Sequence, residues 1–267
     1  MDDLVTTNQT TSHSSKVCEH CGNEIQAIEV EVLGQKRWVQ PSCKCEVDIK
    51  KAEIAKYESF QREREVRELF SISNVGDKYL NASFDNFLNR PGSENAFKIA
   101  KHYAENFTDF GQESIILWGD PGNGKTHLAA AIHNQLREQG KVVVFVSMPE
   151  LLNKIKSTFN RDSEESEEQI LRALNLCDLL IIDDIGAEKP TDWVQETLFI
   201  IIDSRYRREK PILATSNLNT EGLKKQIGKR IVDRMLGASQ PIENKATSYR
   251  EEMAKHRMSK FNAILNG

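Results

Sequence analysis

Eight residues, 119–126, carry the clearest chemical signal in the sequence. They read GDPGNGKT, fit the pattern G-x-x-x-x-G-K-S/T, follow the apolar run SIILW (114–118) and precede the helix-like run HLAAAI (127–132). Glycines let backbone N–H groups turn inward around phosphate oxygens, and the N-terminal end of the following helix attracts the same negative charge. We therefore predict a strand, a phosphate-binding loop and a helix; a glycine turn without a ligand is the disfavoured alternative. The predicted nucleotide-binding residues are Gly119, Asp120, Pro121, Gly122, Asn123, Gly124, Lys125, Thr126 and His127.

Within this loop two side chains have expected roles in chemistry. Lys125 would lie against the β- and γ-phosphates of ATP, and the Thr126 hydroxyl would be a ligand of Mg²⁺. These two roles require a strand before the loop and a helix after it, and the runs 114–118 and 127–132 predict such a strand and helix.

Polar side chains also end two later apolar runs, DLLIIDD (178–184) and PILATSN (211–217). Ligands of open α/β sheets bind at the carboxyl ends of the strands, so these residues should join the phosphate loop. We expect Asp183 to hold the Mg²⁺ shell and Asp184 to orient or deprotonate the attacking water. Asn217 is placed to hydrogen-bond that water or the γ-phosphate. Asp184 could instead cap the following turn, and Asn217 could be an ordinary turn residue.

Two arginines, Arg230 and Arg234, are spaced i and i+4 and so share one face of a predicted helix. Arginine stabilises the charge on a transferring phosphoryl group and is often supplied by a neighbouring subunit. A solvated helix face is the alternative for either residue alone.

Four of the five cysteines, Cys18, Cys21, Cys43 and Cys45, flank a β-like hairpin over residues 28–33 and 37–39. Two such pairs can close a tetrahedral zinc site, which a module this small needs because it has little core. The C-x-C spacing of the second pair is tight, so His20 or His13 is left open as a substitute ligand. Free thiols are an alternative, and a redox C-x-x-C is disfavoured because no βαβ pattern surrounds it.

The remaining sequence alternates apolar strand runs, including KVVVFVS (141–147), with helical patterns, which indicates an α/β fold with a parallel sheet covered on both faces. We expect a disordered tail over residues 1–16, a zinc-binding module over 17–47, a linker helix over 48–75 and a nucleotide-binding domain over 76–267. The linker helix is charged with a sparse apolar stripe, and could be a spacer or a partner-binding surface. Residues 228–267 are expected to be largely helical and basic.

Composition excludes several function classes. The 267 residues are 39% hydrophobic with a net charge of -4, and no apolar run is long enough to span a membrane. The N-terminus lacks the pattern of a secretion signal, so we expect a cytoplasmic protein without a membrane partner. The acidic total does not indicate nucleic-acid binding, but residues 221–260 carry ten Lys and Arg against five Asp and Glu. That local excess could favour a phosphate backbone.

Six segments occur in a characteristic order: YLNASFDNF (79–87), GDPGNGKTHLAAAI (119–132), LLIIDDIGAE (179–188), ILATSN (212–217), GKRIVDRM (228–235) and SYR (248–250). Together they resemble the bacterial and phage replicative helicase loaders, the DnaC/DnaI-type AAA+ ATPases of the IstB-like ATP-binding superfamily. The resemblance implies an AAA+ domain with a reduced helical lid. It also implies that Asn217 senses the nucleotide, that Arg234, with Arg230 nearby, is an arginine finger acting in trans, and that Arg250 contacts the nucleotide in cis.

The function implied by this resemblance is that of an ATP-dependent loader, which binds a DnaB-type hexameric helicase through its N-terminal domain and delivers it onto single-stranded DNA. Helix 149–159 is similar to the loaders' DNA-contacting element, so Lys154, Lys156 and Phe159 are DNA-binding candidates, with an ordinary amphipathic helix as the alternative. Self-association is implied in the helicase-bound state. The cysteine module departs from the simplest loaders and looks like their zinc-containing subgroup. Two other functions stay open: a transposase-helper ATPase acting on double-stranded DNA, and a binding module whose ATPase is only a switch.

Overall fold

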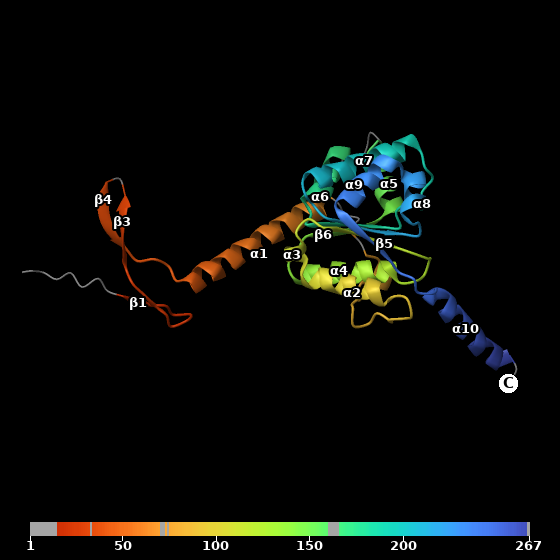
Figure 1. The fold of residues 1–267 in the computed structure, drawn as a ribbon, viewed down its shortest axis with the longest axis horizontal. Coiled ribbons are helices and arrows are strands. Elements are labelled where there is room, and N and C mark those ends of the chain that lie inside the picture. The colour runs from red at the N-terminus through yellow and green to blue at the C-terminus, as the bar shows by residue number, and fades with distance from the viewer. Residues whose placement is uncertain (1–14, 33, 70–72, 74, 160–165, 266–267) are drawn as a thin grey trace, which may run out of the picture. The chain divides into compact units, whose positions relative to one another are not determined.

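The computed structural model describes residues 15–32, 34–69, 73, 75–159 and 166–265. The chain divides into two compact units, one up to residue 58 and one from residue 59 onward (Figure 1). Nearly all of the tail predicted over residues 1–16 lies outside the described residues. The domain boundaries given above stay a prediction.

The N-terminal unit consists of two small antiparallel ribbons. Strand β1 (Lys16–Val17) pairs with β2 (Glu24–Ile25), and β3 (Ile28–Val32) pairs with β4 (Gln35–Val39). Among the described residues of this unit, only Cys18 and Cys43 are buried. A two-stranded ribbon is marginally stable in water, so a unit with so few buried residues needs a further cross-link to be stable.

A long helix, α1 (Lys44–Leu69), crosses the division between the two units. It begins four residues before the start of the predicted linker helix, which places Cys45 on its first turn. Its apolar side chains Ile54, Tyr57 and Phe60 are exposed.

The second unit is built on a five-stranded, wholly parallel sheet with the order β6-β7-β8-β5-β9. The strands are β5 (Ser114–Trp118), β6 (Val143–Ser147), β7 (Leu179–Asp183), β8 (Ile212–Ser216) and β9 (Ser239–Glu243). The first four confirm the predicted strands. Residues 228–267 are largely helical, as predicted, but the strand β9 between α9 (Lys229–Gly237) and α10 (Tyr249–Leu265) was not predicted. Its sequence, SQPIE, is polar and contains Pro241, which a strand tolerates at the edge of a sheet.

Helices cover both faces of this sheet, as predicted (Figure 1). One face carries α2 (Glu94–Glu105) and α4 (Lys125–Glu138), with the short α3 (Phe107–Phe110) and a 3₁₀ turn, η1 (Asp77–Tyr79), nearby. The other face carries α5 (Met148–Ser157), α6 (Glu167–Leu176), α7 (Asp192–Arg207), α8 (Thr220–Ile227) and α9 (Lys229–Gly237). Successive strand residues alternate between the two cores: Leu117 packs with α4, whereas Ile116 packs with α7. This alternation fixes the register of each strand.

The last helix, α10 (Tyr249–Leu265), follows β9 through a short segment, residues 244–248, that runs beside the phosphate loop. Within the described part of the chain, no helix is both long enough and apolar enough to cross a membrane.

Candidate functional site

Residues 119–124 form the predicted loop between β5 and α4, and helix α4 begins at Lys125. Two glycines are required by close approach as well as by their positive φ. A methyl group on Gly119 (φ 140°) would overlap the carbonyl oxygen of Asn244, and one on Gly122 (φ 80°) would overlap Ser248 Oγ. The loop is therefore shaped by the segment after β9 as much as by its own sequence.

Lys125 is buried, and its ammonium group donates hydrogen bonds to the phosphate loop and to Asn217, which follows β8. Its Nζ donates to the carbonyl oxygens of Gly119 and Asp120, both at 2.8 Å, and to Asn217 Oδ1 at 3.0 Å. Burial lowers the pKa of Lys125 to about 8, against the opposite effect of nearby Asp184 and Asp183. Four oxygen acceptors, Asn123 Oδ1 at 3.2 Å included, thus hold the cation where phosphate oxygens would compete for it.

Asp183 ends β7 directly opposite Thr126. The Thr126 hydroxyl donates to the Asp183 carboxylate at 3.0 Å, and the Thr215 hydroxyl donates to it at 2.6 Å. Burial raises the pKa of Asp183, and the two hydroxyl groups act in the opposite direction. Because a hydroxyl and a carboxylate are the oxygen ligands that Mg²⁺ takes beside a phosphate, these residues fit that ion.

Asp184 has the left-handed φ of 60°, which is uncommon for a residue other than glycine and typical of functional sites. Its backbone N–H donates to Thr215 Oγ1 at 2.9 Å, and its carboxylate accepts from Asn217 Nδ2 at 2.8 Å. The amide of Asn217 therefore links Lys125 to Asp184.

A cavity of about 300 Å³ joins these groups. Most of the predicted nucleotide-site residues line it: Pro121, Gly122, Asn123, Gly124, Lys125, Thr126, His127, Asp183, Asp184, Asn217 and Arg250. Gly119 and Asp120 do not line it and contribute carbonyl oxygens to Lys125 instead. His127 Nε2 also lies 3.1 Å from the Ser83 carbonyl oxygen and 3.0 Å from Asn86 Oδ1.

The cavity has walls that the motif analysis did not predict, formed by Lys78, Tyr79, Asn86, Phe87, Leu88, Arg90, Thr215 and Tyr249. Arg90 is the most connected of them. Its guanidinium donates to the carbonyl oxygens of Asn123 and Thr247 and lies 5.5 Å from the ring of Tyr249. It thereby joins the phosphate loop to the start of α10. These contacts bridge up to 157 residues of sequence, which no local pattern reveals.

Arg230 and Arg234 do not line this cavity. Arg234 on α9 donates from Nε to Asp203 Oδ1 on α7 at 3.0 Å. The guanidinium of Arg230 lies 4.6 Å from the ring of Phe199. Both arginines are thus placed on the α7 and α9 side of the sheet.

The predicted DNA-binding residues lie on α5 and just beyond its end. Lys154 is half-buried, whereas Lys156 and Phe159 are exposed. Lys156 Nζ lies 4.9 Å from the ring centre of Trp193, and Phe159 meets the same ring edge-on at 6.2 Å. The predicted helix 149–159 ends at Ser157, and Trp193 was not among the predicted residues.

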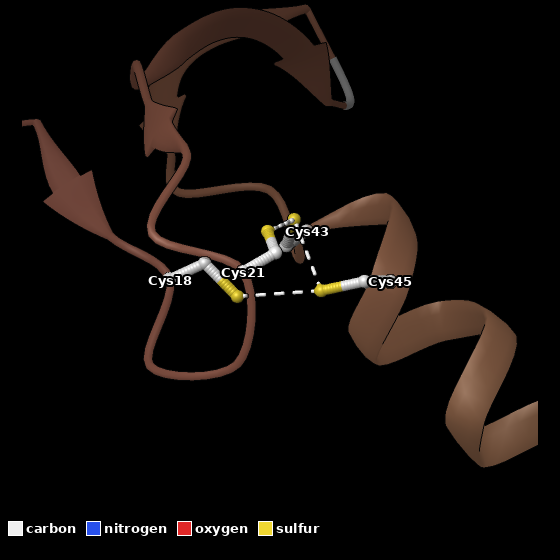
Figure 2. Close-up of side chains that lie close together, drawn as sticks. All are labelled: Cys18, Cys21, Cys43 and Cys45. Atoms are coloured by element: carbon white, nitrogen blue, oxygen red, sulfur yellow. Dashed lines mark hydrogen bonds between the residues drawn. The ribbon is translucent and has the colours of Figure 1, made fainter.

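Four thiols converge in the N-terminal unit (Figure 2). The Sγ atoms of Cys18, Cys21, Cys43 and Cys45 all lie within 4.8 Å of one another. A tetrahedral zinc site with Zn–S bonds of about 2.3 Å has sulfur atoms about 3.8 Å apart, so this set fits zinc. Cys43 ends the loop before α1 and Cys45 is on the helix itself, which explains how the tight C-x-C pair supplies two ligands.

Hydrogen bonds within this cluster shift the pKa values of its thiols in opposite directions. A hydrogen bond from the backbone of Cys45 lowers the pKa of the Cys43 thiol to about 7, while the neighbouring Cys18 and Cys21 thiols raise that of Cys45. Zinc binding by all four sulfur atoms would release the remaining thiol protons, and the cation would balance the charge of the thiolates formed. His20 is not part of the cluster, and His13 lies outside the described residues.

The phosphate loop lies between β5 of the parallel sheet and helix α4, and acidic and polar side chains lie at the ends of β7 and β8. This arrangement defines a nucleotide-binding protein of the AAA+ type. Residues 52–257 match the family described as IstB-like ATP binding protein. The chain belongs to this family. The cysteine cluster lies outside the matched residues.

The chain is also similar in sequence and in fold to known helicase loaders. The chain is 36% identical over 201 residues to the replicative helicase loader DnaC of Escherichia coli (strain K12), a match that covers 74% of this chain and 81% of the relative. DnaC of Buchnera aphidicola subsp. Acyrthosiphon pisum (strain APS) is 35% identical over 199 residues, with coverage of 73% and 80%. A crystal structure of the DnaC helicase loader is matched with a TM-score of 0.57 at 24% identity, over 64% of this chain and 100% of that one. The predicted resemblance to helicase loaders is confirmed.

Proposed function

We propose that this protein is an ATP-dependent loader, which binds a DnaB-type replicative helicase and delivers it onto single-stranded DNA. One observation carries the proposal: the chain pairs an assembled phosphate-loop cavity with 35–36% identity to replicative helicase loaders over about three quarters of its length. A cytoplasmic location follows from that partner.

The cavity supports binding and hydrolysis of ATP. Lys125 would leave its oxygen acceptors for the β- and γ-phosphates, and Thr126 and Asp183 would hold Mg²⁺, which supplies charge neutralisation on the phosphates. Asp184 would orient or deprotonate the attacking water, with Asn217 holding that carboxylate at 2.8 Å. Arg250 lines the same cavity and is the cis arginine.

The position of Arg234 supports hydrolysis across a subunit boundary. It lies outside the cavity of its own chain, on α9, and would act on a nucleotide held by a neighbouring copy. We therefore propose self-association in the helicase-bound state, with Arg230 as an accessory residue.

The N-terminal unit is the proposed helicase-docking part. Its four thiols would hold zinc, and that metal would replace the apolar core that the described residues of the unit lack.

A platform of Lys156, Phe159 and Trp193 supports contact with single-stranded DNA. A cation beside two aromatic rings offers both the charge and the stacking surface that such strands use. The half-buried Lys154 is the weaker candidate of the predicted set.

A loading assay tests the proposal. A DnaB-type helicase is mixed with a single-stranded DNA circle, and helicase retained on the DNA is measured with the wild-type chain, with Lys125→Ala and with no loader. We expect retention with ATP and wild-type protein only. Equal retention in all three reactions, with an ATPase that responds to double-stranded DNA instead, would favour the transposase-helper function.

A further inference from the structure

A single carboxylate holds Arg234 in place. Asp203, near the C-terminal end of α7, has only 12% of its side chain exposed. Its Oδ1 accepts from Arg234 Nε at 3.0 Å, and its Oδ2 is 2.7 Å from Arg207 Nε. The hydrogen bond from Arg234 is the main cause that lowers the pKa of Asp203, so the carboxyl group is charged at neutral pH.

This contact leaves the phosphate-binding edge of Arg234 available. Among the described residues, Nε is the atom through which Arg234 hydrogen-bonds. The ring of Tyr206 lies 5.4 Å from the guanidinium carbon and limits its movement on another side. The two Nη groups, which can bind phosphate oxygens in a bidentate manner, are not used by Asp203.

The charge of the cluster is also suited to an anion. Two guanidinium groups, Arg234 and Arg207, share one carboxylate, so the three side chains keep a net charge of +1. Arg230, one turn earlier on α9, packs on Phe199 and makes no ion pair within the described ranges. Of the two arginine-finger candidates, Arg234 is therefore the one whose Nε is held by a hydrogen bond to a carboxylate.

We propose that Asp203 is a positioning residue that orients Arg234 before it meets the γ-phosphate bound by a neighbouring copy of the chain. The proposal rests on the hydrolysis in trans proposed above. An arginine side chain has about 2 kcal/mol of rotamer entropy. Because Asp203 on α7 already orders the side chain of Arg234, that entropy is not lost during catalysis.

The test compares full-length variants at a protein concentration where turnover per subunit no longer rises. Asp203→Asn keeps the size of the side chain and removes its charge. We expect kcat to fall about tenfold or more, because a misplaced group near a reacting phosphate costs that much. Binding of a fluorescent ATP analogue should stay within about twofold, because the cavity does not include Asp203. Arg207→Lys, which keeps the positive charge on the other side of the same carboxylate and leaves the contact of Asp203 with Arg234 unchanged, is the matched control and should keep its turnover.

Mixing separates positioning from a structural role. Asp203→Asn subunits have an intact nucleotide cavity, and Lys125→Ala subunits have an intact Asp203 and Arg234. The mixture should hydrolyse more ATP than either variant alone. Asp203→Glu should restore part of the activity, because it keeps the charge.

Several results would overturn the proposal. If Arg234→Ala is inactive but Asp203→Asn turns over like the wild type, Asp203 does not position the finger. If mixing restores nothing, Asp203 acts on its own subunit. If Arg234→Ala is as active as the wild type, hydrolysis in trans and the role of Asp203 both fail. If the expected pattern holds but no helicase is bound, the loader function fails and the Asp203 assignment stands.

Discussion

At the scale of single residues, the buried ammonium group of Lys125 is stabilised by hydrogen bonds to carbonyl oxygens of its own loop and to Asn217. Its lowered pKa, about 8, means that the ammonium form begins to lose its proton just above neutral pH. Phosphate oxygens attract the protonated form only. The free site should therefore bind ATP best below pH 8 and progressively less well above it.

This gives a pH prediction. Between pH 8 and 9.5 we expect the Kd for ATP to rise by up to about tenfold per pH unit. Fluorescence titration with an ATP analogue at constant ionic strength measures it. Lys125→Ala is the control and should bind about 100-fold more weakly, a loss of about 2.7 kcal/mol, without this pH dependence. A wild-type Kd that is constant up to pH 9.5 would contradict the assignment.

Local motifs could predict these residues because their contacts are local or lie at strand ends. The loop 119–126 needs only its own sequence to be recognised, and Asp183 needs only the rule that parallel strands end at one edge. Arg90 could not be predicted in this way, because it acts through the carbonyl oxygens of Asn123 and Thr247, which are set by tertiary packing.

At the scale of elements, the segment after β9 supports the phosphate loop. Asn123 Nδ2 donates to the Asn244 carbonyl oxygen, Asn244 Nδ2 donates back to the Asn123 carbonyl oxygen, and the N–H of Tyr249 donates to Gly122. Strand β9 could not be predicted from the sequence, because an edge strand is held mainly by hydrogen bonds to its neighbour. Its polar residues and Pro241 therefore gave no apolar pattern.

Removing one of these bonds should loosen the loop. Asn244 is buried, so Asn244→Ala should lower the free energy of unfolding by about 1–3 kcal/mol and weaken ATP binding as well. Chemical denaturation followed by circular dichroism measures the first effect. Lys245→Ala, at the exposed neighbouring position, should change neither. Full stability in Asn244→Ala would show that the loop holds its shape alone.

The platform between α5 and α7 gives a second prediction at this scale. Trp193→Ala should reduce affinity for single-stranded DNA by about 1–3 kcal/mol, because it removes a stacking surface. The change is measured by fluorescence anisotropy of a labelled oligonucleotide. Trp38→Ala, in the N-terminal unit, serves as the control. Unchanged affinity in Trp193→Ala would remove the platform from the DNA path.

At the scale of the whole molecule, the chain joins two compact units with different chemistry. The family match begins at residue 52, so the four cysteines lie outside the region that this family shares. Four strands of the parallel sheet were predictable from their apolar runs, whereas β9 was not. The cysteine cluster was predictable because metal ligands are few and chemically distinctive, but the tight C-x-C spacing left His20 and His13 open as ligands until the structure brought the four Sγ atoms together.

A change in the N-terminal unit should abolish zinc and helicase binding without affecting ATP binding by the second unit. Cys21→Ser should release zinc, which is measured by a colorimetric metal assay on purified protein. Helicase binding should be lost with the metal, whereas ATP binding should stay within about twofold, because the cavity contains no residue of that unit. Retention of one zinc per chain in Cys21→Ser would argue against the four-thiolate site.

The most direct test of the central claim is a pull-down of a DnaB-type helicase on immobilised full-length protein, with ATP and with ADP, beside the Cys21→Ser variant. We expect the wild-type protein to retain the helicase and the variant to release it. If the wild-type protein retains no helicase with either nucleotide, the chain is not a helicase loader.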